Sequence, residues 1–575
     1  MKINKHLIIL LLIILFNFFI KLFLTIPFPE PVIYGDEFLY KESARYLFEL
    51  TGKKIHPFLA HFTFEYGPIY PLMLSFSFLA KDNYYFWMKI TNVILSTLII
   101  IPVWLISCLY LSKKNSLYPT IVSALLPFHF GFPKYIMSEN LFYPVFLFTI
   151  YFFLKTRTKS SLIKSILTGI FISFCILTRY FASFLLPLLL ITWWLPPNNR
   201  LEYLNIKNKK LSTKIIHFFI ILISSLVILI PWLKSDSNSF FKMSSDYLKG
   251  NINSGQYLVG NFSQSFIWFL LYLCYFILII SPFLTLILWQ LVTMHKKAFR
   301  TKQNSFFILI SGITLAFLIM ATRHSSFNPT IDSYICGRYL IYLGILWIIY
   351  AFINASQIAS LKMNSKKINS LKTATFISIF LIIISYLAII KGPFWKIPSW
   401  FIMDHISPDV FIFKTQTSFI LKGGILVLSY VCLINLILVL IAQKKPKNLS
   451  FIMFIMVAFF YFISDYKIQQ TTLSKEKKNI ITGKDIYLVL KEKYSNLDKI
   501  TIYYNNLNIT DSHLKYSLQF FGADERNFSI INLKDLKDIN QIKERGLLLT
   551  AKNLGNTTKL KNLYGKYFIY ELPIK

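Results

Sequence analysis

Long apolar runs, separated by short basic segments, extend from the N-terminus to about residue 465. Many of these runs are about 20 residues long, which is the length that a helix needs to cross the hydrocarbon core of a bilayer. Backbone groups in lipid must bond within their own segment, so we expect the runs to be helices. The pattern predicts about 13 transmembrane helices, near residues 6–26, 84–112, 117–132, 139–155, 162–178, 180–195, 215–233, 264–292, 305–322, 338–355, 372–391, 417–442 and 449–465.

The pattern changes after about Tyr466. Strand-like runs at 499–504, 528–532, 546–551 and 567–572 alternate with helix-like stretches at 483–494 and 511–521. Such alternation is typical of a small α/β domain. The sequence therefore predicts a membrane-embedded domain over residues 1–465 and an α/β domain over residues 466–575.

Charge in the loops predicts the topology. One alternating set of loops is rich in Lys and Arg, with Glu202 as its only acid, and comprises residues 112–115, 155–164, 200–214, 295–302, 362–372 and 444–447. The opposite set holds the acids Asp36, Glu37, Glu42, Glu49, Glu65, Asp82, Glu139, Asp236, Asp246, Asp332, Asp404 and Asp409. Basic loops stay in the cytoplasm. We therefore expect a multi-pass protein of the plasma or inner membrane with a cytoplasmic N-terminus and, given an odd helix count, an extracytoplasmic C-terminal domain.

Composition agrees with this class and excludes others. The chain is 55% hydrophobic and 15% charged, and its mean hydropathy is +0.54. The net charge of +35 is spread over short loops and not gathered on one soluble surface, which argues against a nucleic-acid-binding protein. The 5 cysteines lie in or at the ends of apolar runs without CxxC spacing, so no disulfide framework or thiolate metal site is predicted. Residues 1–26 show no A-x-A site and are read as an uncleaved first helix.

The first long outer loop, residues 27–83, holds the first candidate chemistry. Residues 34–50 predict an amphipathic helix lying on the membrane, with one face formed by Leu39, Ser43, Tyr46, Leu47 and Leu50. Asp36 and Glu37 open it and point in different directions, so one carboxylate can face a cavity while the other caps the helix or holds a neighbour. The alternative is an ordinary N-cap and first-turn acid. His61 and Glu65 have the spacing of two metal ligands on a helix, with interfacial residues as the alternative.

Glu139 and three arginines extend the candidate site. Glu139 begins a membrane helix, where an ionisable group is costly unless it meets water or a partner; the alternative is an N-cap pair with Ser138. Arg179, Arg323 and Arg338 lie on the outer side, against the charge rule. They are either interfacial anchors or ligands for a phosphate on a bound substrate.

These segments form an ordered set that resembles the membrane glycosyltransferases of the GT-C fold, in particular the superfamily of protein O-mannosyltransferases and lipid A aminoarabinose transferases. The matching segments are GDE (35–37), EYGPIYPLM (65–73), MSENLFYP (137–144), LTRYFA (177–182) and GRYL (337–340). The resemblance covers roughly residues 1–345 and implies a polyprenyl-phosphate sugar donor used on the outer face of the membrane. It implies that Asp36 is the catalytic base, that Glu37 and Glu139 position the acceptor or a cation, and that Arg179 and Arg338 neutralise the donor phosphate. It leaves open whether a divalent metal ion takes part.

The chemistry of the residues agrees with the resemblance. Transfer from a sugar phosphate needs a carboxylate to accept the acceptor's proton and fixed positive charge for the leaving phosphate, but no general acid. We therefore expect an inverting hexosyl- or pentosyltransferase that acts on a hydroxyl of a glycan, lipid or protein. The main alternative is a transporter or flippase of lipid-linked saccharides. It is disfavoured because the predicted helices carry few charges and show no repeat. A polymerase or an oligosaccharide-block transferase of the same fold is not distinguished.

Overall fold

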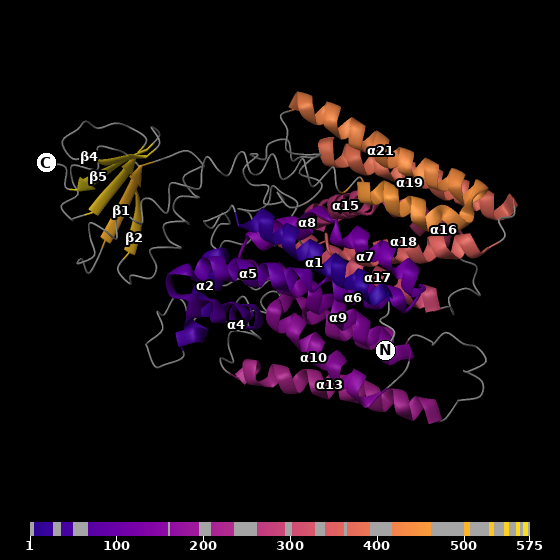
Figure 1. The fold of residues 1–575 in the computed structure, drawn as a ribbon, viewed down its shortest axis with the longest axis horizontal. Helices are drawn as coiled ribbons and strands as arrows, with labels where there is room; N and C mark the ends of the chain where they lie inside the picture. Colours follow the sequence, from indigo (N-terminus) through magenta and orange to yellow (C-terminus); the bar gives the residue numbers. More distant parts are fainter. Residues whose placement is uncertain are drawn as a thin grey trace.

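The computed structural model describes a helical bundle and a separate sheet. The described residues are 5–26, 36–49, 67–158, 161–194, 209–234, 262–293, 302–327, 340–361, 365–391, 417–459 and 461, together with the strand segments 500–505, 528–533, 546–550, 559–563 and 567–572. The sheet and the short helices α2 (Asp36–Glu49) and α4 (Ile69–Ser75) lie at the same end of the bundle (Figure 1).

The remaining helices pack side by side (Figure 1). In chain order they are α1 (Lys5–Thr25), η1 (Phe76–Asn83), α5 (Tyr84–Thr97), α6 (Ile100–Cys108), α7 (Lys113–Ala124), α8 (Pro127–Gly131), η2 (Phe132–Lys134), α9 (Glu139–Thr158), α10 (Leu162–Thr178), η3 (Tyr180–Phe184), α11 (Leu185–Trp193), α13 (Lys209–Lys234), α15 (Phe262–Ile279), η4 (Ser281–Phe283), α16 (Leu284–Thr293), α17 (Lys302–Phe327), α18 (Leu343–Ser360), α19 (Ser365–Lys391), α21 (Thr417–Lys444) and η8 (Pro446–Asn448).

The chain is a multi-pass membrane protein. In its described part 6 helices are long and apolar enough to cross a membrane, or up to 7 if one bent pair counts as a single span. The predicted count of about 13 is not confirmed. Several predicted spans are helical but shorter than the 18-residue window of a span, among them Leu162–Thr178, Tyr180–Trp193 and Pro446–Phe459. The predicted helix 117–132 is divided, because α7 ends at Ala124 and Pro127 opens α8.

The predicted helix 264–292 is also wrong in one respect, because it is broken in the middle. The segments on the two sides of the break meet at 62°. Pro282 lies in η4 at the break, where a proline removes a backbone donor and clashes with the preceding turn. Asn435 of α21 bonds the segment that follows the break: its side-chain amide donates to the Ser281 carbonyl at 2.9 Å and accepts from the Thr285 N–H at 3.1 Å. Groups freed by the break are thus satisfied inside the bundle.

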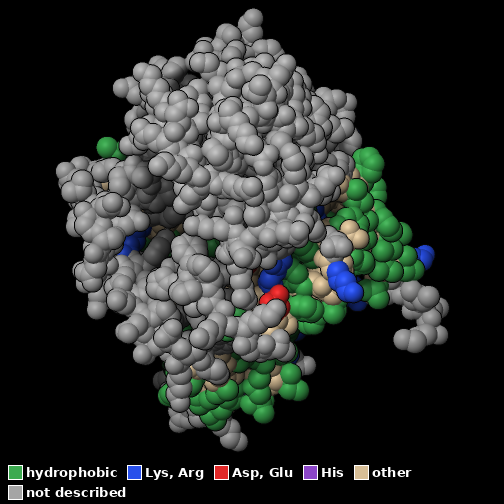
Figure 2. Space-filling model, turned by 90° about the vertical axis from the view of Figure 1, so that its left-hand side faces the viewer, with side chains coloured by type: hydrophobic (Ala, Val, Ile, Leu, Met, Phe, Trp, Pro, Cys, Tyr) green, Lys and Arg blue, Asp and Glu red, His purple; other side chains and the backbone are tan. Residues whose placement is uncertain are grey.

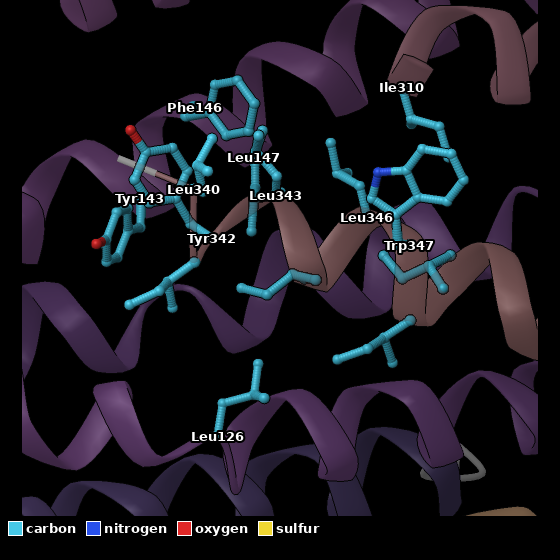
Figure 3. Packing of buried hydrophobic residues seen from close by; sticks show 14 of the residues in the cluster. Leu126, Tyr143, Phe146, Leu147, Ile310, Leu340, Tyr342, Leu343, Leu346 and Trp347 are labelled. Atoms are coloured by element: carbon cyan, nitrogen blue, oxygen red, sulfur yellow. The ribbon is translucent and has the colours of Figure 1, made fainter. Parts of the chain in front are cut away.

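Aromatic side chains fill the bundle around the start of α18. The ring of Tyr342 lies 4.3 Å from that of Tyr143, 5.3 Å from Phe317 and 5.6 Å from Phe142, measured between ring centroids. Figure 3 shows Tyr342 between α9 residues and the first turn of α18, with Leu340 and Leu343 beside it. These contacts fix the start of α18 against the N-terminal half of α9, the helix that begins with Glu139.

The C-terminal strands form one mixed sheet in the order β2-β1-β3-β5-β4. The strands are β1 (Ile500–Asn505), β2 (Phe528–Leu533), β3 (Gly546–Thr550), β4 (Lys559–Leu563) and β5 (Tyr567–Leu572). β1 is parallel to β2 and β3, whereas β5 is antiparallel to β3 and β4. The four predicted strand segments coincide with β1, β2, β3 and β5, and β4 was not predicted. The helix-like stretches at 483–494 and 511–521 lie outside the described residues.

Asn435→Ala is expected to destabilise the protein, because the Thr285 N–H at the start of α16 loses its side-chain partner inside an apolar bundle, whereas the Ser281 carbonyl keeps its bond from the Leu284 N–H. Each unsatisfied buried group costs about 1–3 kcal/mol. Thermal unfolding in detergent is the measurement, with Asn448→Ala at an exposed position as the control. Equal melting temperatures for the two variants would show that the hydrogen bonds of Asn435 do not stabilise the protein.

Candidate functional site

The carboxylate of Glu37 anchors α2 to the rest of the site. Glu37 is fully buried, and its Oε2 accepts a bond from the Ile136 N–H at 3.1 Å and from the Tyr85 hydroxyl at 3.4 Å. These partners come from α5 and from the turn between η2 and α9. Backbone N–H bonds to a carboxylate stabilise its charged form. Glu37 therefore links the first turn of α2 to α5 and to the turn before α9.

α2 is more deeply packed than an interfacial helix. Residues 40–44 are all buried, and the predicted lipid face is divided, with Ser43 buried and Leu39, Tyr46 and Leu47 half-buried. The exposed residues are Phe48 and Glu49 at its end. The amphipathic pattern thus identified the helix but not its burial, because protein covers it on more than one side.

Two asparagines hold the turn at 132–138 in shape. The Asn140 amide donates to the carbonyls of Phe132, Tyr135 and Met137 at 3.0–3.2 Å. The amide of Asn92, from α5, donates to the Tyr135 carbonyl at 2.9 Å. A turn inside the bundle has no helical partners for its backbone, so these amides replace them.

Tyr70 extends this framework to α4. Its hydroxyl donates to Asn92 Oδ1 at 2.8 Å, and its ring meets that of Tyr40 edge-on at 4.9 Å. Burial raises the pKa of Tyr70 well above its ordinary value, which keeps the hydroxyl protonated as a donor. The α2 and α4 helices are therefore fixed to the same turn.

Arg179 places its guanidinium at this turn. Its Nη2 lies 2.6 Å from Glu139 Oε1, and its Nε donates to Ser138 Oγ at 2.7 Å. Ser138 Oγ also accepts from the Tyr40 hydroxyl at 2.8 Å. Glu139 is fully buried and Arg179 is 11% exposed, so the pair lies at the edge of the core. The side chain of Ser138 thus bridges α2 and Arg179, and its carbonyl accepts the Phe142 N–H at 2.8 Å to start α9.

Further buried charges surround this group. Lys41 Nζ pairs with Glu42 Oε1 at 2.7 Å, and both side chains are buried. Lys89 Nζ lies 4.5 Å from the ring centre of Tyr85, the tyrosine that donates to Glu37. Buried ions need such partners. This end of the molecule shows a few basic side chains and an acidic one among hydrophobic surface in its described part (Figure 2).

Gly67 brings the first loop against the end of α10. It has φ +77°, and a Cβ there would lie 2.3 Å from the Leu177 carbonyl oxygen and 2.9 Å from that of Thr178. Only glycine fits both the backbone conformation and this approach. The segment that carries Gly67 is therefore in contact with the residues that immediately precede Arg179.

The structure brings together Glu37, Glu139 and Arg179 around the turn at 135–139. Asp36 is the first residue of α2, and nothing further is described of its side chain. Arg323 lies near the end of α17 and is half-buried. Arg338, His61 and Glu65 lie outside the described residues. In the part of the chain that is described, no three His, Cys, Asp or Glu side chains converge on a point that could hold a metal ion.

Sequence reasoning missed Tyr40, Tyr85, Asn92 and Asn140, and it considered Ser138 only as a cap. One signal was present: Tyr40 follows Asp36 by one helical turn and so shares its face. The other contacts join segments far apart in the chain, and no spacing rule reports them.

Gly67→Ala is expected to destabilise the protein by about 2 kcal/mol or more, since it adds a steric clash with backbone to a strained φ. Gly312→Ala is the control, because a Cβ there would meet Leu188 Cδ1 at 3.2 Å, a flexible side chain. The measurement is the melting temperature in detergent. An equal drop in melting temperature in both variants would show that the close approach of Gly67 to the end of α10 has no special role in stability.

Comparison with known proteins identifies the fold. No protein-family model and no curated protein matches the sequence. A structure of ArnT from Cupriavidus metallidurans bound to undecaprenyl phosphate matches with a TM-score of 0.56 and 12% identity over 98% of this chain and 97% of ArnT. Its apo state matches with a TM-score of 0.54 and 11% identity over the same shares of both chains.

A looser similarity links the chain to an archaeal oligosaccharyltransferase. AglB from Archaeoglobus fulgidus, in complex with an inhibitory peptide and a dolichol-phosphate, has a TM-score of 0.43 and 10% identity over 88% of this chain and 63% of AglB. The fold assignment rests on the two ArnT structures, which extend over nearly the whole of both chains. Together with the ordered sequence motifs, they show that this chain has the GT-C fold, the fold of the membrane glycosyltransferase ArnT.

Proposed function

We propose that the protein transfers a sugar from a polyprenyl-phosphate donor to an acceptor hydroxyl on the outer face of the membrane. The observation that carries this proposal is the position of Arg179. It is held by Ser138 and Glu139 beside the helix that Asp36 opens. A fixed cation beside a candidate base is what displacement of a phosphate by a hydroxyl requires.

Asp36 is the proposed base. The acceptor oxygen attacks the anomeric carbon while the bond from that carbon to the phosphate oxygen breaks, and Asp36 takes the hydroxyl proton. Such proton transfer contributes about 10²–10⁴-fold to the rate. Glu37 supports this step indirectly, because its bonds to Ile136 and Tyr85 fix the first turn of α2.

Arg179 is the proposed group for the leaving phosphate, with Arg338 and Arg323 as further cations. Before the donor binds, Glu139 balances the charge of Arg179 in a largely buried pair. A donor phosphate that binds at the guanidinium would be the second anion in contact with it, besides Glu139. Because negative charge grows on the bridging oxygen as the sugar leaves, a guanidinium at that oxygen stabilises the transition state more than the ground state.

The similarity to ArnT supports a lipid-linked donor, because that structure holds undecaprenyl phosphate. We propose that the donor of this chain is likewise a polyprenyl-phosphate sugar and that the sugar is a hexose or a pentose. The acceptor is a hydroxyl of a glycan, lipid or protein. In this proposal His61 and Glu65 are the side chains that would hold a divalent cation. The C-terminal domain and the first long loop lie outside the cytoplasm, as the loop charges predict.

The flippase alternative has one observation in its favour. Lys21 is buried within the candidate span of α1 and donates to Ser96 Oγ at 3.2 Å, so the spans of the described part do contain an ionisable group. A flippase moves its lipid intact, whereas a transferase breaks the bond between sugar and phosphate. Release of free polyprenyl phosphate from a labelled donor therefore separates the two functions.

Asp36→Asn is expected to lower transfer by at least about 100-fold, since the amide cannot accept the proton. The assay follows labelled sugar from polyprenyl-phosphate donors to acceptors in membranes and then with purified protein. Glu49→Gln, at the exposed end of the same helix, is the control and retains activity. Full activity in Asp36→Asn would remove Asp36 as the base.

The product is expected to carry the inverted anomeric configuration, because a single displacement by the acceptor reverses the centre. Anomeric coupling constants of donor and product, measured by NMR, provide the comparison. A product with retained configuration would contradict direct displacement by the acceptor from the face opposite the phosphate.

A further inference from the structure

Ser138 joins the two halves of the proposed reaction centre through one oxygen. Its Oγ accepts from Tyr40 at 2.8 Å and from Arg179 Nε at 2.7 Å. Tyr40 lies one helical turn after Asp36 on the same face of α2. A serine hydroxyl has two acceptor positions, and these two donors occupy both. The oxygen thus relates the helix of the candidate base to the candidate phosphate cation.

The guanidinium of Arg179 is held at two of its nitrogens by adjacent residues. Nε is bound by Ser138, and Nη2 lies 2.6 Å from Glu139 Oε1. One contact to a planar group leaves it free to rotate about that contact, whereas two contacts fix its plane. Ser138 is fully buried, so water does not replace its hydroxyl. Glu139 supplies the charge and Ser138 supplies a hydrogen bond in the guanidinium plane, while the guanidinium carbon lies 5.5 Å from the ring centre of Phe181.

We propose that Ser138 is a positioning residue that sets the orientation of Arg179 relative to Asp36, a role that rests on the proposed sugar transfer. The base acts on the acceptor oxygen and the cation acts on the leaving oxygen, at opposite sides of the anomeric carbon. Their separation must therefore match the length of the reacting group. Small misplacements of such groups cost up to about 100-fold in rate.

The decisive experiment is a double-mutant cycle between Ser138→Ala and Arg179→Lys. Lysine keeps the positive charge but has no Nε, so Ser138 has no guanidinium to orient in that background. In the wild-type background, Ser138→Ala is expected to lower kcat about 10- to 100-fold with little change in KM for the donor. In the Arg179→Lys background, the same change is expected to alter kcat less than about twofold.

Tyr40→Phe provides a second test that leaves Ser138 in place. It is expected to lower kcat in the wild-type background and to have no further effect once Ser138 is alanine, because the Tyr40 hydroxyl acts through the same oxygen. Ser107→Ala is the matched control. Ser107 is a buried serine whose hydroxyl donates to the Val103 carbonyl of its own helix at 2.8 Å, and its loss is expected to leave kcat unchanged.

The outcomes separate this inference from the function on which it rests. If the wild-type protein transfers no sugar from any donor tested, the proposed function fails. If the wild type is active and Ser138→Ala lowers kcat by the same factor in both backgrounds, Ser138 only supports the fold and the positioning role is overturned. Wild-type kcat in Ser138→Ala overturns it as well.

Discussion

The buried carboxylate of Glu37 is the contact on which the candidate site depends. A buried carboxyl oxygen needs hydrogen-bond donors, and here the Ile136 N–H and the Tyr85 hydroxyl donate to Oε2 of Glu37. Because these donors belong to a turn and to α5, the bond fixes the start of α2 in three dimensions. The position of Asp36, the orientation of Tyr40 and the link to Ser138 all follow from that one anchored turn.

The same rule explains why asparagines recur where the chain leaves regular helix. Asn140 and Asn92 bond the carbonyls of the turn before α9, and Asn435 bonds two backbone groups of the segment that follows the break in the α15–α16 pair. A side-chain amide carries a donor and an acceptor on a short stem, so it can replace a helical bond without adding charge. Irregular backbone buried inside a helical bundle is tolerated only with such replacement.

Arg179 and Glu139 form a largely buried ion pair. Either charge alone would destabilise the folded protein at this position, because it would lack both water and a counter-charge. Removing water from two charges is costly, and their attraction offsets that cost only with good geometry. The bond that Arg179 donates to Ser138 and the 2.6 Å ion pair with Glu139 hold the guanidinium in place in the protein itself. If Arg179 binds the donor phosphate as we propose, the cation is already oriented for it, and little of the binding energy is spent in arranging it.

Much of the architecture could be predicted from the sequence because it depends on local patterns. Apolar run lengths predicted a multi-pass helical protein, alternation marked the positions of β1, β2, β3 and β5, and the motif order led to the GT-C fold. Helix count and helix continuity could not be predicted in the same way. Hydropathy does not separate one long helix from two segments that meet at 62° around Pro282.

The features of the candidate site can be separated in the same way into those that the sequence identified and those that only the structure decided. The sequence by itself determined which charged residues break the pattern, and so identified Glu37, Glu139 and Arg179. Only the tertiary structure decided that Glu37 is an anchor, that Glu139 pairs with Arg179, and that Ser138 bridges Tyr40 and Arg179. The physical reason is that hydropathy and helical period report one segment at a time, whereas a buried polar group is defined by partners from distant segments.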